Sequence, residues 1–167
     1  MADAVIRGAL GRFGDFVSAD VMLPARHSFL PPQGMAEQVL MDLGDWANAK
    51  ARKYPIVLAG QAFGYGTGRE SPSRALRAAG VTAVIATSFS RIFFRNAINN
   101  GILVVQCPEL VETAAADGDE VAIAMEAGTI TWNGGTFRFS PMSEVVLRVL
   151  RAGNLVAYGR QLLAKAG

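Results

Sequence analysis

The sequence contains very little cysteine or histidine. Cys107 and His27 are the single residues of their kinds among 167. One cysteine excludes a disulfide framework and any iron–sulfur or zinc site built from cysteines of this chain alone. One histidine excludes a histidine-rich zinc site. We therefore expect this chain to hold no metal ion of its own.

Charged residues and long apolar runs are also scarce. Charged residues make up 18% of the chain and hydrophobic residues 51%, which excludes intrinsic disorder and suggests apolar surface for a partner. No apolar run approaches the ~20 residues that a membrane helix needs. A net charge of +2 without a Lys/Arg run favours no nucleic-acid partner. Because the first residues do not resemble a signal peptide, we expect a cytoplasmic protein that does not enter a membrane.

The middle of the chain alternates between short apolar strands and helices, which predicts parallel strands joined by right-handed crossovers. The predicted strands are 56–59, 81–86 and 102–105, and the predicted helices are 71–79, with Ser71 as its N-cap, and 89–100, capped by Ser88. Antiparallel strands are predicted at 121–125, 129–132 and 136–139, where Asn133-Gly134 indicates a hairpin. We therefore expect an α/β fold with a mixed parallel and antiparallel sheet and flanking helices.

The flanking regions are less regular. From the N-terminus we predict strands at 5–13 and 15–26, an exposed loop at 27–35 because Pro31-Pro32 disfavours a helix, and a short helix at 36–43. Near the C-terminus we predict a helix from Ser140-Pro141 to Ala152, stopped by Gly153, and a second helix after it.

A glycine-dense loop, residues 60–70, follows the strand predicted at 56–59. Glycines let backbone amides approach a ligand closely, and the following helix N-terminus favours an anion. Arg69 can bind a carboxylate, and Thr67 adds a hydroxyl. The alternative is a tight turn that needs glycine only for steric reasons. The loop lacks the Walker lysine, and Arg69 stands where G-x-G-x-x-G needs its last glycine, so a small carboxylate fits better than a nucleotide.

The same region resembles the small subunit of 3-isopropylmalate dehydratase, a member of the aconitase superfamily. The resemblance covers nearly the whole chain. The matching residues are Asp20, Pro24, Ala25 and Arg26 upstream, and Phe63, Gly64, Gly66, Arg69, Glu70, Ala75, Leu76, Gly80, Ser88, Phe89, Arg91, Ile92, Phe93, Asn96, Asn99 and Gly101 in the core.

The resemblance implies a swivelling β/β/α domain of the aconitase C-terminal type over residues 1–167, with a substrate-recognition loop at about 26–36 and the glycine-rich active-site loop at 60–70. It implies a large-subunit partner, in a heterodimer or heterotetramer, whose three cysteines hold a [4Fe–4S] cluster. No cofactor is then bound by this chain, in agreement with its single cysteine.

Residue roles follow from the same resemblance. Thr67 stands where the family has its catalytic serine, and Arg69 stands where an arginine binds a substrate carboxylate. Gly66 and Gly68 offer backbone amides to the substrate, although the family usually has serine at the position of Gly68, and Ser71 replaces a usual histidine. Asp20 matches an aspartate at the edge of the active site and is, with Thr67, a candidate catalytic residue; an ordinary turn cap is the alternative.

In the recognition loop, Arg26, His27 and Phe29 are candidate substrate-binding residues by the same resemblance. The loop is apolar around Phe29 and Leu30, which favours an alkyl group on the substrate over a third carboxylate. For His27, an ordinary solvated loop histidine is the alternative.

The resemblance implies the small subunit of a hydro-lyase that isomerises 2- or 3-isopropylmalate through a cis-unsaturated diacid in leucine biosynthesis. It is expected to be active only with the large subunit. One alternative is a related hydratase for another C4–C6 diacid of the dimethylmalate, maleate or citraconate type. Another is a non-catalytic relative that acts as an anion-binding or assembly module. Thr67 and Gly68 differ from the two serines usual in the family, and this difference concerns the identity of the substrate more than the class of reaction.

Overall fold

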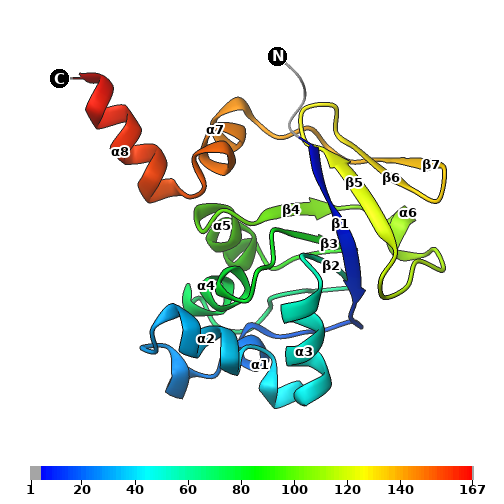
Figure 1. Cartoon of the computed structure of the whole chain (residues 1–167), viewed down its shortest axis with the longest axis horizontal. Coiled ribbons are helices and arrows are strands. Elements are labelled where there is room, and N and C mark those ends of the chain that lie inside the picture. Colours follow the sequence, from blue (N-terminus) through cyan, green and yellow to red (C-terminus); the bar gives the residue numbers. More distant parts are fainter. Residues whose placement is uncertain (1–4, 167) are drawn as a thin grey trace.

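A computed structural model describes residues 5–166. Its seven strands form one sheet in the order β4-β3-β2-β1-β5-β6-β7 (Figure 1). The strands are β1 (Val5–Arg12), β2 (Ile56–Ala59), β3 (Ala83–Ala86), β4 (Leu103–Gln106), β5 (Glu120–Ala124), β6 (Thr129–Trp132) and β7 (Gly135–Arg138). The helices are α1 (Ala19–Met22), η1 (Ala25–His27), α2 (Pro32–Gln38), η2 (Met41–Leu43), α3 (Asp45–Lys53), α4 (Ser71–Ala78), α5 (Arg91–Asn99), α6 (Pro108–Val111), α7 (Glu144–Ala152) and α8 (Leu155–Ala166).

The sheet has a parallel half and an antiparallel half, as predicted. Strands β1 to β4 run parallel, and β5 to β7 form an antiparallel ribbon. The central strand β1 joins them, because it pairs parallel with β2 and antiparallel with β5. Asn133 (φ 48°) and Gly134 (φ 77°) form the β6–β7 turn in left-handed conformations, which fits the Asn-Gly hairpin signal.

The two faces of the parallel strands lie in separate cores. Alternate residues such as Val57, Val84 and Val104 face helices α1 to α5. Their neighbours, among them Leu58 and Ile85, face α6 and the antiparallel ribbon. Burial on both faces explains why β2 and β3 are continuous apolar runs instead of alternating ones.

The strand predicted at 15–26 is wrong. This segment forms α1 and η1, and Ser18 caps α1 through Oγ, which accepts a hydrogen bond from the backbone N–H of Val21. A serine N-cap with Asp20 in the first turn is a helix-start signal. That signal prevails here over the alternating apolar pattern.

The loop predicted at 27–35 is also partly wrong, because α2 begins at Pro32. Pro31 occupies the N-cap position and Pro32 the first helical position, where a missing N–H breaks no intrahelical bond. The recognition segment 26–36 therefore consists of the end of η1, a short connection and the start of α2, and is not a single loop.

Several predicted boundaries also shift. The helix predicted at 36–43 is divided between α2 and η2. Ser90, and not Ser88, caps α5, and Ser143 caps α7, so that α7 begins at Glu144 and not near Ser140. Gly153 (φ 95°) ends α7 as predicted, and α8 then projects away from the sheet (Figure 1). No helix within residues 5–166 has the length and apolar character needed to cross a membrane.

Candidate active site

The candidate residues lie at the carboxyl edge of the parallel strands. The chain leaves β1, β2 and β3 at this edge through segments 13–18, 60–70 and 87–90. Open α/β sheets bind ligands at this edge, because several strand-to-helix connections converge there. The glycine-rich loop lies between the other two connections.

Both neighbouring connections hold the glycine-rich loop in place. Oδ1 of Asp15 accepts a hydrogen bond from the backbone N–H of Gln61 at 2.8 Å, and Oγ of Ser88 accepts one from Ala62 at 2.8 Å. Oγ of Ser90 donates to the carbonyl of Gly64 at 2.7 Å. Sequence reasoning missed Asp15 and Ser90. The sequence marks them only by position, because each lies in the short connection that follows a strand, Asp15 after β1 and Ser90 after β3.

Asp20 and Arg69 meet at this loop. Nη2 of Arg69 lies 2.6 Å from Oδ1 of Asp20. The Nε atom of Arg69 is buried and has no hydrogen-bond partner among residues 5–166. Gly66 (φ 104°) lies so close that a Cβ there would be 2.8 Å from Oδ2 of Asp20. The structure thus brings Asp20, Gly66 and Arg69 together, although 49 residues separate the two charged partners.

The candidate base is tied to the candidate arginine through the backbone. Oγ1 of Thr67 accepts a hydrogen bond from the backbone N–H of Arg69 at 3.3 Å. Gly68, between them, is exposed and has an ordinary negative or extended φ. A Cβ at Gly68 would be in ordinary van der Waals contact with Ile92, at 3.6 Å.

Two asparagines, Asn96 of α5 and Asn100 at its C-cap, support the far side of the loop. Nδ2 of Asn96 donates to the carbonyls of Gly68, at 3.4 Å, and Arg69, at 3.2 Å. Nδ2 of Asn100 donates to Oε1 of Glu70 at 2.9 Å. The signal that could have found this pair is their spacing, because residues four apart share one helix face.

Helix α4 begins at Ser71, within the predicted range, but its N-cap is Glu70 and not Ser71 as predicted. The Oγ atoms of Ser71 and Ser28 are 3.0 Å apart and form a hydrogen bond. Because Ser28 follows η1, this contact joins the recognition segment to the N-terminus of α4. Sequence reasoning missed Ser28.

The other candidates in the recognition segment do not touch the glycine-rich loop through polar bonds. Nη2 of Arg26 pairs with Oδ1 of Asp42 at 2.7 Å. His27 lies at the end of η1 and is partly buried. Phe29 is 99% exposed.

The single cysteine is a structural thiol. Cys107 is fully buried at the end of β4. Burial raises the pKa of this thiol, and the Glu109 carboxylate raises it further, so it is protonated at neutral pH. Within residues 5–166 no group of three or more His, Cys, Asp or Glu side chains could hold a metal ion. The residues of this chain therefore do not fit an iron–sulfur cluster.

Together, these groups can bind and act on an anion. Arg69 supplies the positive charge, the loop amides and the N-terminus of α4 add partial positive charge, and Thr67 supplies a hydroxyl that accepts a hydrogen bond from the Arg69 amide. Asp20, whose side chain is 56% exposed, balances the guanidinium while leaving the site open to solvent.

Known proteins share this sequence and fold. Residues 36–110 match the aconitase C-terminal domain family. The 3-isopropylmalate dehydratase small subunit of Metallosphaera sedula is 36% identical over 96% of this chain and 99% of its own length. That of Saccharolobus islandicus is 37% identical over 95% and 96%. A crystal structure of 3-isopropylmalate dehydratase (LeuD) from Methanocaldococcus jannaschii has a TM-score of 0.83 and 31% identity, and covers 98% of this chain and all of that one.

The structural match agrees with the mixed sheet described above. The sequence matches cover almost the full length of this chain and of each relative. The chain belongs to the family of 3-isopropylmalate dehydratase small subunits.

Proposed function

We propose that this chain is the small subunit of a two-subunit hydro-lyase that interconverts 2- and 3-isopropylmalate through a cis-unsaturated diacid, in leucine biosynthesis. The observation that supports it best is the convergence of Arg69, Asp20 and the Thr67 hydroxyl on one glycine-rich loop. Family membership supports isopropylmalate as the substrate. A cytoplasmic location belongs to the same proposal, because the enzyme's cluster and this chain's free thiol suit a reducing compartment.

Arg69 is the substrate-binding group of this proposal. Its guanidinium can hold a planar carboxylate with two parallel hydrogen bonds. In the structure Nη2 is paired with Asp20, so an incoming carboxylate shares or displaces that partner. Asp20 therefore keeps the guanidinium oriented until substrate arrives, and takes up its charge again when product leaves.

Thr67 is the proton-transfer group. A malate loses a proton from one carbon and a hydroxyl from the neighbouring carbon when it is dehydrated, and Oγ1 of Thr67 takes the proton. The Arg69 amide donates to this oxygen, and the guanidinium of the same residue adds positive charge to the site, so both favour the deprotonated, negatively charged form that takes the proton. In the reverse direction the same oxygen returns the proton.

The departing hydroxyl needs a Lewis acid, and residues 5–166 contain no cluster of side chains that could hold one. A [4Fe–4S] cluster on the large subunit would supply that chemistry. The large subunit must therefore cover the carboxyl edge where Arg69 and Thr67 lie. We propose that residues 1–167 act as one swivelling unit in this closure.

The recognition segment 26–36 would select the substrate. The Ser28–Ser71 bond positions it at the N-terminus of α4, and its exposed Phe29 offers apolar contact to an alkyl group. A second candidate function is hydration of another C4–C6 diacid, of the dimethylmalate, maleate or citraconate type. It is favoured by Thr67-Gly68 in place of two serines, because the added methyl and the missing hydroxyl reshape the site.

The deciding experiment is anaerobic co-expression with the large subunit, followed by hydration assays across unsaturated diacids. We expect turnover with the isopropylmalate series only when both subunits are present. Preference for a smaller diacid would establish the second candidate. Turnover by this chain alone, or no turnover of any diacid by an assembled, cluster-loaded complex, would disprove the proposal.

A further inference from the structure

Phe16 has a backbone conformation that aromatic residues rarely adopt. It lies in the connection between β1 and α1, and its φ of 56° is in the left-handed region. In that region the Cβ atom of an L residue crowds the following carbonyl oxygen, so a bulky residue there is strained. Glycine or asparagine adopts the same conformation at lower cost. The presence of an aromatic residue at this position therefore calls for an explanation.

Packing within the free chain does not provide that explanation. The side chain of Phe16 is 60% exposed, and it lies outside both apolar cores described above. The next residue, Val17, is buried in the core that faces the helices. Strain persists in proteins mainly at functional positions, where the surrounding structure enforces it. The strain and the exposed ring together indicate that Phe16 serves a contact made outside this chain.

Hydrogen bonds to the glycine-rich loop enforce the conformation of Phe16. Its backbone N–H donates to the carbonyl of Gln61 at 2.8 Å, and Oδ1 of Asp15 accepts a hydrogen bond from the backbone N–H of Gln61. The N–H of Gly60 donates to the carbonyl of Gly14 at 3.1 Å. The backbone at Phe16 is thus fixed against the loop. A ring on a rigid backbone loses little conformational entropy when a partner covers it.

Two further large apolar side chains are exposed along the same loop. Tyr65 lies within the loop, and its carbonyl accepts a hydrogen bond from the N–H of Ala19, in the segment that follows Phe16. Ile92, near the start of α5, lies beside Gly68. We call Phe16, Tyr65 and Ile92 the rim residues, because they follow the glycine-rich loop from its beginning to its end.

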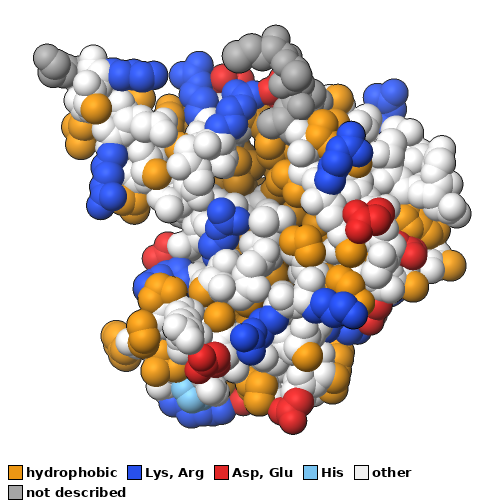
Figure 2. Space-filling model, in the orientation of Figure 1, with side chains coloured by type: hydrophobic (Ala, Val, Ile, Leu, Met, Phe, Trp, Pro, Cys, Tyr) orange, Lys and Arg blue, Asp and Glu red, His pale blue; other side chains and the backbone are white. Residues whose placement is uncertain are grey.

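Exposure alone does not single out the rim residues. Hydrophobic side chains also reach the surface along α8 (Figure 2), among them Leu163, which is 76% exposed. That residue has ordinary helical backbone, so its exposure is not coupled to strain. Phe16 combines exposure with strain, and it does so beside the loop that carries Thr67 and Arg69.

Two arginines beside Ile92 form no ion pair within residues 5–166. Arg91 and Arg95 are both exposed. They lie four residues apart on α5, where like charges destabilise a helix. Acidic groups of a partner would offset that repulsion. The rim therefore fits a partner surface that is apolar opposite Phe16 and carries acidic residues near Ile92.

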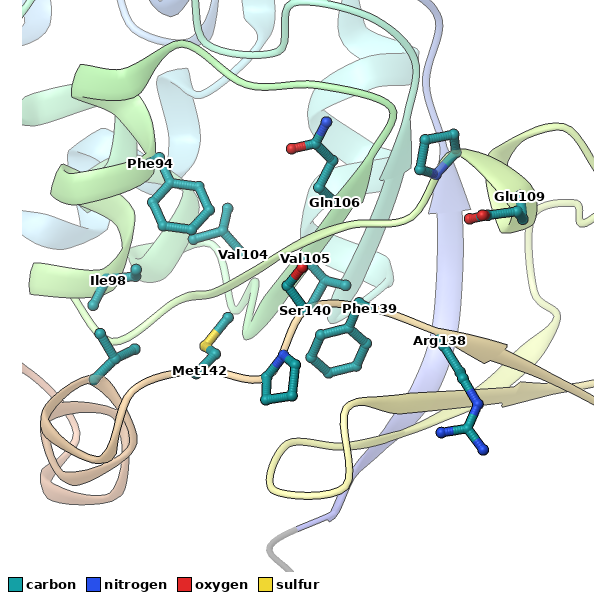
Figure 3. A pocket seen from close by; sticks show the side chains of 13 residues that line it. Phe94, Ile98, Val104, Val105, Gln106, Glu109, Arg138, Phe139, Ser140 and Met142 are labelled. Atoms are coloured by element: carbon teal, nitrogen blue, oxygen red, sulfur yellow. The ribbon is translucent and has the colours of Figure 1, made fainter.

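The large subunit is the partner that must approach these residues. Residues 5–166 contain no cluster of side chains that could hold the Lewis acid of the proposed reaction. The subunit that supplies it therefore comes against the glycine-rich loop and meets the exposed rim. A cavity of about 710 Å³ lies between α5 and the segment that joins β7 to α7 (Figure 3). None of the rim residues lines that cavity, so a ligand bound there would not explain their exposure.

We infer that Phe16 is an anchor of the interface with the large subunit, with Tyr65 and Ile92 packed beside it. Aromatic residues are enriched at the centres of protein interfaces, where they contribute much of the binding energy. The fold thus retains strain at Phe16 in order to present this ring to the partner. This inference rests on the proposed function, which supplies the partner.

The test compares Phe16→Asn with the parent chain. Asparagine adopts the left-handed region more readily, so the folded-to-unfolded ratio of the free chain should rise about two- to tenfold in urea unfolding. Anaerobic titration with the large subunit should show assembly weakened about tenfold or more, because the anchoring ring is lost. The KM of the assembled enzyme should stay within about twofold of the parent value. A ring that only supports the fold would not give a gain in stability together with a loss of assembly.

Leu163→Gln is the matched control, because it also replaces an exposed apolar side chain by an amide, but on ordinary helical backbone. It should change neither stability nor assembly by more than about threefold. Hydroxyl-radical labelling of the parent chain adds a measurement that needs no variant. The rings of Phe16 and Tyr65 should lose most of their labelling when the large subunit binds.

The outcomes distinguish the two proposals. An active enzyme in which Phe16→Asn assembles as tightly as the parent overturns this inference and leaves the proposed function in place. Unchanged assembly with a raised KM assigns Phe16 to the substrate and also overturns it. A less stable Phe16→Asn chain, equal weakening by Leu163→Gln, or labelling that persists in the complex would do the same. If the parent chain forms no complex and shows no turnover, the proposed function fails as well.

Discussion

Nη2 of Arg69 lies 2.6 Å from Oδ1 of Asp20, and this ion pair joins helix α1 to the glycine-rich loop. The side chains are 29% and 56% exposed, so the pair adds less than about 1 kcal/mol to the stability of the fold. The pair matters for geometry, because it fixes the position of the guanidinium at the glycine-rich loop. Substitutions here should therefore change kinetics more than folding.

Arg69→Lys should lower kcat/KM of the two-subunit enzyme by ~10- to 1000-fold. Lysine keeps the positive charge but loses the planar fork, and one charged hydrogen bond is worth ~1.5–3 kcal/mol, to which mispositioning adds. The measurement is steady-state kinetics on the assembled enzyme. Arg74→Lys, at an exposed arginine of the following helix α4, is the control and should leave the kinetics unchanged. Equal kinetics for Arg69→Lys and the parent would remove Arg69 from the site.

Thr67→Val should reduce kcat by ~10²- to 10⁴-fold, the usual contribution of a positioned acid–base group. Valine keeps the shape and deletes the hydroxyl, so substrate binding through Arg69 should persist. Thr67→Ser keeps the hydroxyl and should retain activity. Both variants are measured as kcat with bound cluster quantified, which excludes assembly defects. Parent-like turnover by Thr67→Val would show that another group moves the proton.

Gly68→Ser and Gly66→Ala should differ sharply in stability. A Cβ at Gly68 has ordinary contacts, whereas Gly66 (φ 104°) has a conformation that L residues avoid and faces Asp20 at 2.8 Å. We expect a change within about 0.5 kcal/mol for Gly68→Ser and a loss of about 1–2 kcal/mol for Gly66→Ala. Urea unfolding of this chain measures both. A loss of equal size in the two variants would contradict the loop geometry described here.

Asn96→Ala should raise KM about two- to tenfold with little change in kcat. The side chain positions the loop through the carbonyls of Gly68 and Arg69, and one such bond is worth ~0.5–1.5 kcal/mol. Asn99→Ala, at the next asparagine of the same helix, serves as the control. A fall in kcat with KM unchanged would mean that Asn96 acts on the chemistry itself and not on binding geometry.

Asp117 should make stability depend on pH. Partial burial raises the pKa of this carboxyl, but hydrogen bonds from Lys50 and the Arg12 amide outweigh that effect and hold it below its ordinary value of 3.8. A lowered folded-state pKa gives stability that is present above pH 3.8 and is lost as the pH falls through the folded value. Asp117→Asn should therefore destabilise the chain at pH 7 and much less at pH 3.

Urea unfolding at the two pH values measures this difference. Glu112→Gln, at an exposed carboxylate nearby in the sequence, is the matched control. A destabilisation of Asp117→Asn that is the same at pH 3 and pH 7 would show that packing, and not ionisation, accounts for it.

The parallel core of the fold was predictable because its strands are continuous apolar runs followed by glycine or polar turns, as in β2 and β3. Helix α3 was not predicted, since it packs through small residues, Ala47 and Ala51, and its sequence DWANAKARK carries no apolar stripe. The start of α2 was excluded by its two prolines, although one of them suits the first turn of a helix.

The candidate site shows a similar division. The glycines and Arg69 stand out because their chemistry is local to one loop. The partners that position Arg69 come from α1 and α5, and the family resemblance, not local residue chemistry, is what pointed to Asp20 and Asn96. Long-range polar contacts depend on how the elements pack, and packing leaves no periodic signal in the residues that make such contacts.

The central place of β1 in the sheet has a consequence during synthesis on the ribosome. One edge of β1 can pair as soon as β2 has emerged from the ribosome. The opposite edge of β1 pairs with β5, which begins at Glu120, about sixty residues after the end of β2. At ~5–20 residues per second, that edge stays unpaired for roughly 3–12 s. A nascent chain therefore passes through a stage with an open strand edge at both sides of its partial sheet, which makes this interval the one in which chaperones matter most.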